Sequence, residues 1–455
     1  MYGTKPVKLK VSDAVKAHLT YLCQQSNNLI NSSLYLIRQR HFESCETKCY
    51  FDREGFYRCG RRDRFLKITY AELCKLMKDE LSYKILGGQC AQQTLKTVVE
   101  SCNSYNGLLK AYWKGEVDKP KVPNYRKKGG LAPITYPAQA ISFNLETGKC
   151  KLPISCELNN DIKTDLGLTE IWINGCTGIT IEQIAEVRII PKNQSLYVEY
   201  VYKVEEPPSI QLDYSLALGI DPGLTNWLTC LSNKGKSFII DGRKIKSINQ
   251  NYHRKVAKLK KGNPAKYWDK VLDSVTEKRN NQMRDVINKA AKFVINYCLK
   301  HTIGNIVFGW NTGSKNEINI GKKNNQEFVQ IPTARLKNRI KELCDYYGII
   351  FTETEEAYSS KASFLDNDLV PRHGEKPSQY KFSGKRIKRG LYRTKNGLLI
   401  NSDCNGSANI LKKVMTQLNL DLAKVTRGAL ALPKRYDLFT DMKKLYRKTD
   451  CGGAF

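Results

Sequence analysis

The residues from Ala217 to Thr229, ALGIDPGLTNWLT, constrain the fold more than any other stretch of the chain. An apolar run ends in an aspartate, Asp221, and a Pro-Gly pair follows at once, which predicts a strand that stops at a sharp turn. A second apolar run begins at Trp227 and predicts a strand that pairs back on the first. The carboxylate of Asp221 is therefore expected at a sheet edge, on rigid backbone, where a metal ion can be held. An ordinary turn aspartate that caps its own backbone gives the same local pattern.

Strand and helix patterns alternate after this turn. A strand near Ser237–Ile240 is followed by a basic segment and by a long helix over about 269–300. A β-branched strand at 305–308, an amphipathic helix at 333–347 and a strand at 349–354 come next. This order predicts an α/β sheet covered by helices. Carboxylates at the strand ends of such a sheet can meet at one edge although they lie far apart in sequence.

The first half of the chain has a different organisation. Helical periodicity covers about 11–39, 69–81 and 89–113, and a linker rich in proline and basic residues follows at 119–130. The period then changes to two, which predicts a small barrel or sandwich. The expected strands are Ala140–Phe143, Lys149–Leu152, Ile171–Ile173, Ile179–Ile181, Val187–Ile190 and Leu196–Tyr202. A rigid boundary is expected at Pro207–Pro208.

Charge and cysteine usage narrow the function. The chain has 75 Lys and Arg against 44 Asp and Glu, a formal net charge of +31, which indicates a polyphosphate partner. No apolar run of membrane-spanning or signal-peptide length is found, so a soluble intracellular protein is expected. The 15 cysteines include no C-x-x-C pair and are expected to be reduced. One cluster, His41, Cys45, Cys49 and Cys59, lacks the usual spacing of a zinc site.

Two further acidic segments follow strand-like runs. In residues 352–364, TETEEAYSSKASF, Glu355 and Glu356 come directly after a strand. In residues 398–411, LLINSDCNGSANIL, Asp403 opens a helix. An aspartate at a helix start also stabilises the helix dipole, and an acidic strand end can neutralise a nearby lysine such as Lys361. Neither segment identifies a site by itself.

Taken in order, these motifs resemble the TnpB family, also called OrfB, which is encoded by small bacterial insertion sequences and is related to type V CRISPR effectors. The resemblance covers nearly the whole chain. Its motifs are the G-I-D-P-G strand, the basic helical insertion, the loop G-K-K-N-N-Q-E-F-V-Q-I-P, the S-D-C-N-G-S-A-N-I helix start, the A-Q-Q-T-L helix at Ala91 and the linker P-K-V-P-N-Y-R-K-K-G.

The resemblance implies an α/β fold with an added β-barrel. A C-terminal RNase H-like RuvC nuclease domain is expected at 209–455, with a basic helical insertion at about 243–300 and a basic segment at about 376–395 in place of a zinc finger. An N-terminal β-barrel, or wedge, domain is expected at 1–208, with a helical recognition lobe at about 10–118.

The implied function is that of an RNA-guided DNA endonuclease of the TnpB type. It would cut guide-matched double-stranded DNA by two-metal-ion hydrolysis and support the maintenance of a transposable element. The expected partners are a guide RNA from the element's own end and double-stranded DNA with a short flanking motif. They would be bound by a monomeric ribonucleoprotein in the bacterial cytoplasm, associated with the nucleoid when DNA is bound. A nuclease-inactive RNA-guided repressor and a compact type V CRISPR effector remain alternatives.

The resemblance also assigns catalytic residues. Asp221 matches the first catalytic aspartate of the family and Asp403 the last. The middle acid usually ends the strand that here reads Ile306–Trp310, where this chain has Gly309. Either the nuclease is inactive or the neighbouring strand supplies the acid.

We expect the neighbouring strand to supply it, because two acids end that strand while Asp221 and Asp403 are both present. Alternation along the strand places Glu353 and Glu355 on one side and Glu356 on the other, and we rank Glu355 first and Glu356 second. The expected ligands of Mg²⁺, or of Mn²⁺ in its place, are Asp221, Glu355 and Asp403.

Many relatives carry two C-x-x-C pairs between the middle and last acids. The interval 363–400 contains no cysteine here, so no structural zinc is expected. It holds FSGKRIKRGLYR instead, a pattern typical of phosphate binding with aromatic residues available for stacking. The residues expected to bind nucleic acid are Lys127, Lys128, Arg254, Lys258, Lys385, Arg386, Lys388 and Arg389.

Overall fold

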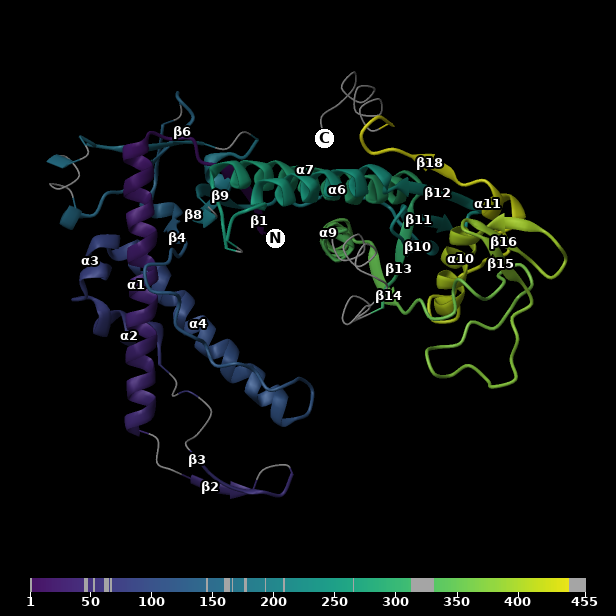
Figure 1. Ribbon diagram of the computed structural model, residues 1–455, viewed down its shortest axis with the longest axis horizontal. Coiled ribbons are helices and arrows are strands. Elements are labelled where there is room, and N and C mark those ends of the chain that lie inside the picture. Colours follow the sequence, from purple (N-terminus) through teal and green to yellow (C-terminus); the bar gives the residue numbers. More distant parts are fainter. Residues whose placement is uncertain are drawn as a thin grey trace. The chain divides into compact units, whose positions relative to one another are not determined.

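The computed structural model of the chain is shown in Figure 1. It describes residues 2–44, 48–51, 54–60, 65, 68–144, 146–158, 164–165, 167–175, 178–192, 194–207, 209–264, 266–311 and 331–441. The chain divides into two compact units, Met1–Glu205 and Glu206–Phe455. Among the described residues, no helix is both long and apolar enough to cross a membrane.

In the described part of the first unit, four α-helices and two main sheets are present. The helices are α1 (Asp13–Ser44), α2 (Tyr70–Met77), α3 (Leu81–Leu86) and α4 (Gly88–Trp113). They confirm the helical periodicity of this half, since the leucines that recur along it, such as Leu19, Leu95 and Leu109, are fully buried. Helix α2 begins at a capping box in which Thr69 and Glu72 satisfy each other's backbone N–H groups.

The strands of this unit lie in separate sheets. One sheet has the antiparallel order β1-β9-β8-β4, and a second has the order β5-β6-β7. The bounds are β1 (Tyr2–Lys8), β4 (Ile134–Pro137), β5 (Ser142–Asn144), β6 (Lys149–Leu152), β7 (Ile171–Asn174), β8 (Ile184–Lys192) and β9 (Ser195–Lys203), and a hairpin is formed by β2 (Lys48–Phe51) and β3 (Tyr57–Gly60).

Two expectations for this region were wrong in detail. The described residues contain no closed barrel, because β1 and β4 are the edges of an open four-stranded sheet. The strand expected at 179–181 is instead the approach to a short 3-10 helix, Ile181–Gln183, and Thr180 and Gln183 cap that helix as a reciprocal pair. Because the cap satisfies the local N–H groups, this segment needs no strand partner.

A six-stranded mixed sheet forms the centre of the second unit, in the order β14-β13-β10-β11-β12-β18. The bounds are β10 (Asp213–Pro222), β11 (Asn226–Ser232), β12 (Lys236–Asp241), β13 (Ile303–Gly309), β14 (Ile350–Thr354) and β18 (Lys434–Tyr436). Strand β11 is antiparallel to both of its neighbours, and the other pairs are parallel. The carboxyl ends of β10, β12, β13 and β14 therefore lie at one edge, together with the start of β11.

Helices cover both faces of this sheet (Figure 1). Leu218 and Ile220 of β10 pack with α6 (Arg243–Lys260), α7 (Lys270–Lys300) and α9 (Thr333–Tyr347) in one apolar core. Ala217, of opposite alternation, packs in a second core. That core is built with α10 (Ser402–Val414), α11 (Arg427–Ala431) and the small sheet β15 (Lys385–Lys388), β16 (Leu391–Arg393) and β17 (Leu399–Asn401). Odd-numbered residues of β10, including Asp221, thus face α10.

The order of strands and helices expected for this half is confirmed. Helix α7 begins where the side chain of Asp269 accepts a hydrogen bond from the backbone N–H of Leu272 (2.7 Å), close to the expected start. Strands β15, β16 and β18 had not been anticipated. The expected loop G-K-K-N-N-Q-E-F-V-Q-I-P, residues 321–332, lies outside the described residues except for its end.

Candidate active site

Helix α10 lies close against β10 because glycines stand at the points of contact. A Cβ added to Gly219 would lie 2.6 Å from Leu411 Cγ, and the hydroxyl of Ser407 donates to the carbonyl of Gly219 (2.8 Å). A Cβ added to Gly406 would lie 2.5 Å from Asp221 Oδ2. Side chains larger than hydrogen at either position would push the helix away. The glycines thus allow the Asp221 carboxylate to lie directly against the first turns of α10.

Asp403 is in the first turn of α10. The side chain of Asn401 caps this helix and accepts hydrogen bonds from the backbone N–H groups of Asp403 (3.0 Å) and Cys404 (3.1 Å). This cap fixes the direction in which the helix starts. Asp403 lies on the same helix turn as Gly406. Its side chain is 28% exposed, so its carboxylate remains open to solvent.

The place above Gly309 is filled by Glu356. A Cβ added to Gly309 would lie 3.0 Å from Glu356 Cγ, 3.2 Å from Glu356 Oε1 and 2.6 Å from Ile410 Cδ1. Gly309 is in register with Thr354 of β14, and Glu356 follows two residues later. A side chain that ends β13 is therefore replaced in space by one that comes from just beyond the neighbouring strand.

Asn311 holds Glu356 in this position. The side-chain oxygen of Asn311 accepts from the backbone N–H of Glu356 (2.9 Å), and Asn311 Nδ2 lies 3.4 Å from Glu356 Oε2. The carbonyl of Glu356 accepts from the N–H (3.1 Å) and the hydroxyl (2.8 Å) of Ser359. Asn311 was not identified from the sequence. Its only signal is a short polar side chain two residues beyond Gly309, at the end of a buried strand.

Glu355, which strand alternation had favoured, points elsewhere. Its Oε1 lies 3.1 Å from Lys413 Nζ and accepts from the backbone N–H of His373 (3.1 Å). Lys413 is nearly buried, with 5% of its side chain exposed, so its charge needs this partner. The structure brings Asp221, Glu356 and Asp403 together and directs Glu355 to Lys413, because β14 ends at Thr354 and simple alternation does not continue beyond it.

The surroundings of Asp221 and Glu356 disfavour their ionised forms. Burial raises the pKa of Asp221 well above its usual range, the carboxylates of Glu356 and Asp403 raise this pKa further, and Arg386 acts in the opposite direction. Burial raises the pKa of Glu356 to about 7, against an opposing effect of Lys413. Burial disfavours the ionised form of both acids, and like charges add to this effect at Asp221.

The donor set fits a hard divalent cation in its chemistry. Carboxylate oxygens are the ligands that Mg²⁺ and Mn²⁺ prefer, and a bound cation would relieve the repulsion that raises the pKa of Asp221. In the described part of the chain, no three His, Cys, Asp or Glu side chains already surround a metal position. Arg386 instead lies 3.6 Å from Asp403 Oδ1.

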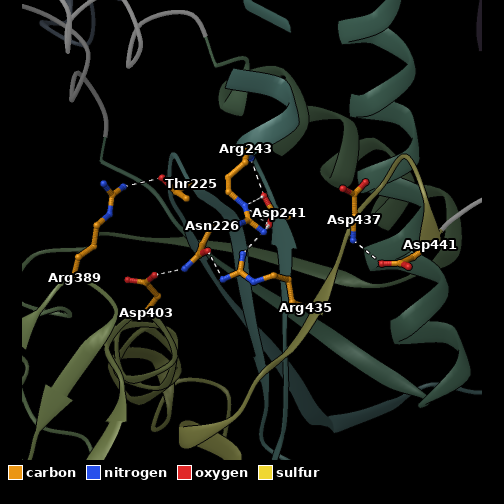
Figure 2. A network of polar contacts seen from close by, with 9 residues as sticks. All are labelled: Thr225, Asn226, Asp241, Arg243, Arg389, Asp403, Arg435, Asp437 and Asp441. Carbon is orange, nitrogen blue, oxygen red and sulfur yellow. Dashed lines mark hydrogen bonds and ion pairs between the residues drawn. The ribbon is translucent and has the colours of Figure 1, made fainter. Parts of the chain in front are cut away.

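A polar network extends from Asp403 across the sheet edge (Figure 2). Asp403 Oδ2 accepts from Asn226 Nδ2 (2.6 Å), and Arg435 connects Asn226 Oδ1 (2.9 Å) with Asp241 Oδ2 (2.9 Å). Asp241 also forms an ion pair with Arg243 (2.6 Å). Neither Asn226 nor Arg435 was singled out from the sequence, because their partners are far away along the chain.

The basic residues expected to bind nucleic acid are all exposed, and they lie in three places. Lys385, Arg386, Lys388 and Arg389 belong to the hairpin that begins with β15, beside the acidic cluster. Arg389 donates to the hydroxyl of Thr225 (2.8 Å), in the turn that follows Asp221 (Figure 2). Arg254 and Lys258 are on α6, and Lys127 and Lys128 are in the linker of the first unit.

Comparison with known proteins adds a family match for part of the chain. Residues 199–315 match the model of the OrfB_IS605 family, described as a probable transposase. This span contains Asp221 and Gly309 and ends before Glu356 and Asp403. No curated protein matches the chain.

Solved structures that match include two cryo-EM complexes. One is described as the Cas12f1-sgRNA-target DNA complex, with 16% identity, a TM-score of 0.31, and coverage of 90% of this chain and 98% of that one. The other is described as the CRISPR-Cas12f ternary complex, with 14% identity, a TM-score of 0.33, and coverage of 87% and 81%.

Proposed function

We propose that this chain, which is a TnpB-like protein of the OrfB family, is an RNA-guided endonuclease that cuts guide-matched double-stranded DNA. The observation that carries the proposal is that the Glu356 side chain fills the space above Gly309 and, in addition to burial and together with Asp403, raises the pKa of Asp221. It supports a complete set of three acids in a chain whose sequence lacks the usual middle one.

The arrangement of the second unit supports a RuvC-type domain on an RNase H-like sheet. Three antiparallel strands, β10 to β12, are followed by two parallel ones, β13 and β14, and the acids lie at the carboxyl edge. We assign this domain to residues 209–455. Residues 1–208 form the wedge domain in this proposal, with α1 to α4 as its recognition lobe.

Asp221, Glu356 and Asp403 would hold two divalent cations, Mg²⁺ or Mn²⁺, which when bound activate water and stabilise the leaving oxygen. The other charged side chains near these acids would bind and orient the nucleic acid or keep the acids in place. Arg386 and Arg389 place positive charge beside the acids, where a phosphodiester backbone would lie. Lys413 neutralises Glu355 and so keeps that second acid out of the cluster.

The partners in this proposal are a guide RNA and its DNA target. A net charge of +31, with exposed cations on α6, on the β15 hairpin and in the 119–130 linker, provides contacts to phosphates rather than to bases. Specificity by base pairing requires no more from the protein than charge, shape and a short flanking motif. Such a monomeric ribonucleoprotein would act either for a transposable element or in a CRISPR system. The source of its RNA, the end of the element or a CRISPR array, distinguishes these two contexts.

The test is cleavage by the purified ribonucleoprotein, assembled with RNA from the element's own end and given a chosen guide. Matched plasmid DNA should be cut in Mg²⁺ and left intact with a mismatched guide or with EDTA. Asp221→Ala should abolish cutting and preserve RNA-dependent binding, because it removes a metal ligand and leaves the basic surfaces unchanged. A wild-type complex that binds its matched target and never cuts it, in Mg²⁺ or Mn²⁺, would establish the alternative that Gly309 suggests, an RNA-guided repressor.

A further inference from the structure

Asp403 accepts a short hydrogen bond from a residue of the hairpin that carries Asp221. Asn226 is the first residue of β11, and its Nδ2 donates to Asp403 Oδ2 at 2.6 Å. A bond of this length to a carboxylate is charge-assisted and stronger than a bond between neutral groups. One turn, from Asp221 to Asn226, therefore supplies both a carboxylate of the cluster and the donor that orients another.

Arg435 determines which way the amide of Asn226 faces. An asparagine side chain can be turned so that either its oxygen or its nitrogen points at a neighbour. Arg435 has only donors, and its Nη2 lies 2.9 Å from the side chain of Asn226, so the oxygen must face Arg435. The nitrogen is then left to face Asp403, as Figure 2 shows.

Arg435 and its strand are held by three sets of contacts. Its Nη1 donates to Asp241 Oδ2 (2.9 Å), and Asp241 is only 7% exposed. Its strand, β18, pairs in parallel with β12, with Ile239 opposite Arg435. The ring of Tyr436 packs 4.7 Å from that of Phe293 on α7. Since backbone, ring and ion pair all hold β18 in place, Arg435 presents a rigid donor to Asn226.

We propose that Asn226 and Arg435 are positioning residues for the metal-binding carboxylate of Asp403, so that strand β18 is part of the nuclease site. This inference rests on the proposed function. The bond from Asn226 holds Oδ2 of Asp403. The other oxygen, Oδ1, has only the longer contacts with the Ser402 hydroxyl (3.3 Å) and Arg386 (3.6 Å), and it is the oxygen that we expect a cation to bind. Hydrogen bonds to a ligating carboxylate typically change metal affinity or activity 10- to 100-fold when they are removed.

The test uses the guide-loaded ribonucleoprotein with Asn226→Ala, Arg435→Gln and the double variant. Mn²⁺ binding is followed by electron paramagnetic resonance, and the Mg²⁺ concentration for half-maximal cleavage is measured at saturating target. Asn226→Ala should weaken Mn²⁺ binding about 10-fold and raise the Mg²⁺ requirement to match. Arg435→Gln should give a smaller loss, and the double variant should equal Asn226→Ala, because Arg435 acts through Asn226.

Lys434→Gln is the matched control, since Lys434 is an exposed neighbour on the same strand and should leave Mn²⁺ binding unchanged. Thermal unfolding checks the fold, and Arg435→Lys replaces Arg435→Gln if that variant is unfolded. Unaltered Mn²⁺ affinity in Asn226→Ala, or losses that multiply in the double variant, would overturn the inference. Mn²⁺ affinity needs no cleavage, so a wild-type complex that fails to cut defeats the proposed function without deciding this one.

Discussion

Two aspartates end strands at the same edge of the central sheet and differ in their surroundings. Asp241 ends β12, and although burial raises its pKa, hydrogen bonds from Arg243 and Arg435 lower the pKa overall. Asp221 lies near the end of β10, and burial together with Glu356 and Asp403 raises its pKa. An ionised carboxylate beside arginines stabilises the fold. An ionised carboxylate that is buried beside other carboxylates destabilises the fold unless a cation binds to it. Charge balance thus separates the structural aspartate from the candidate catalytic one.

Two adjacent glutamates also differ in their surroundings. Glu355 is neutralised by Lys413, and Glu356 lies above Gly309 with its pKa raised to about 7. The two residues are of the same type and both follow the end of β14, but they differ in burial and in their partners. The difference between the two pairs, Asp221 with Glu356 against Asp241 with Glu355, can be tested by substitutions that remove one charge at a time.

The largest expected effect is that of Glu356→Gln on cleavage. Glutamine is nearly isosteric but neutral, so it binds a divalent cation poorly, and the rate should fall more than about 100-fold, beyond the range for residues that act indirectly on a metal. Glu355→Gln is the matched control and should keep most of the activity, because Glu355 contacts Lys413 and His373 instead. Cleavage rates at saturating Mg²⁺ decide between them. The reverse result, with only Glu355→Gln inactive, would return the ligand to Glu355.

The second prediction is that the two acidic environments respond to pH with opposite signs. Glu356 has a folded-state pKa of about 7 against a usual value of 4.5, so the folded state binds more protons between these values. The free energy of unfolding should therefore fall as pH rises from about 4.5 to 7. Without metal, Glu356→Gln removes this pH-dependent loss. Its free energy of unfolding should therefore exceed that of wild type by on the order of 2 kcal/mol at pH 8 and differ little near pH 4.5.

Asp241→Asn should behave in the opposite way. Because the folded-state pKa of Asp241 is lowered, its contribution is present above the usual value of 3.8 and is lost as pH falls through the folded pKa. The substitution should destabilise by about 1.5–3 kcal/mol from pH 5 to 8, the range for hydrogen bonds to charged groups. Unfolding in EDTA across this pH range tests both variants. If both changed stability in the same direction at pH 8, charge balance would not explain the difference between the two sites.

Local patterns were sufficient to predict most strands and the places of Asp221 near a strand end and of Asp403 at a helix start. The turn after Asp221 and the helix start at Asp403 are short signals that depend on neighbouring residues alone. Alternation in β14 also separated Glu355 from Glu356. It could not show which of them joins Asp221, because that depends on how the chain turns after Thr354 and on the space above Gly309.

Long-range pairings could not be predicted. Strand β18 has three residues and gains its stability from β12, so its own sequence has no periodicity to detect. The bond between Asn226 and Arg435 joins residues 209 positions apart, and that between Asn226 and Asp403 spans 177. The open sheet of the first unit could not be predicted for the same reason, because its edge strands β1 and β4 pair with strands far along the chain.

The third prediction tests whether Glu356 owes its place to the missing side chain at Gly309. Gly309→Ala puts a methyl group 2.6 Å from Ile410 Cδ1 and 3.0 Å from Glu356 Cγ, so one of them must move. Ile410 Cδ1 is the end of a flexible side chain and Glu356 Cγ lies within one, so the cost should be about 1–2 kcal/mol, in the lower range for overpacking. Cleavage should fall as well, since the Glu356 carboxylate is displaced.

Gly107→Ala in α4 is the control for this substitution. A Cβ there meets nothing within 4 Å, and the change should stabilise the helix by about 1 kcal/mol. Thermal unfolding and cleavage rates are measured on both variants. Full activity and unchanged stability in Gly309→Ala would mean that Glu356 does not depend on this glycine.

The smallest expected effect concerns the outer lysines of the β15 hairpin. Arg386 and Arg389 contact Asp403 and Thr225, whereas Lys385 and Lys388 are exposed on the same strand and available to phosphates. Lys385→Glu with Lys388→Glu should weaken target binding and reduce the slope of log affinity against log salt by about 2, roughly one for each lost phosphate contact. Lys300→Glu with Lys341→Glu makes the same change in net charge at exposed helical positions and should leave the slope nearly unchanged. Equal slopes for the two double variants would show that net charge alone, and not this hairpin, attracts the nucleic acid to the acidic cluster.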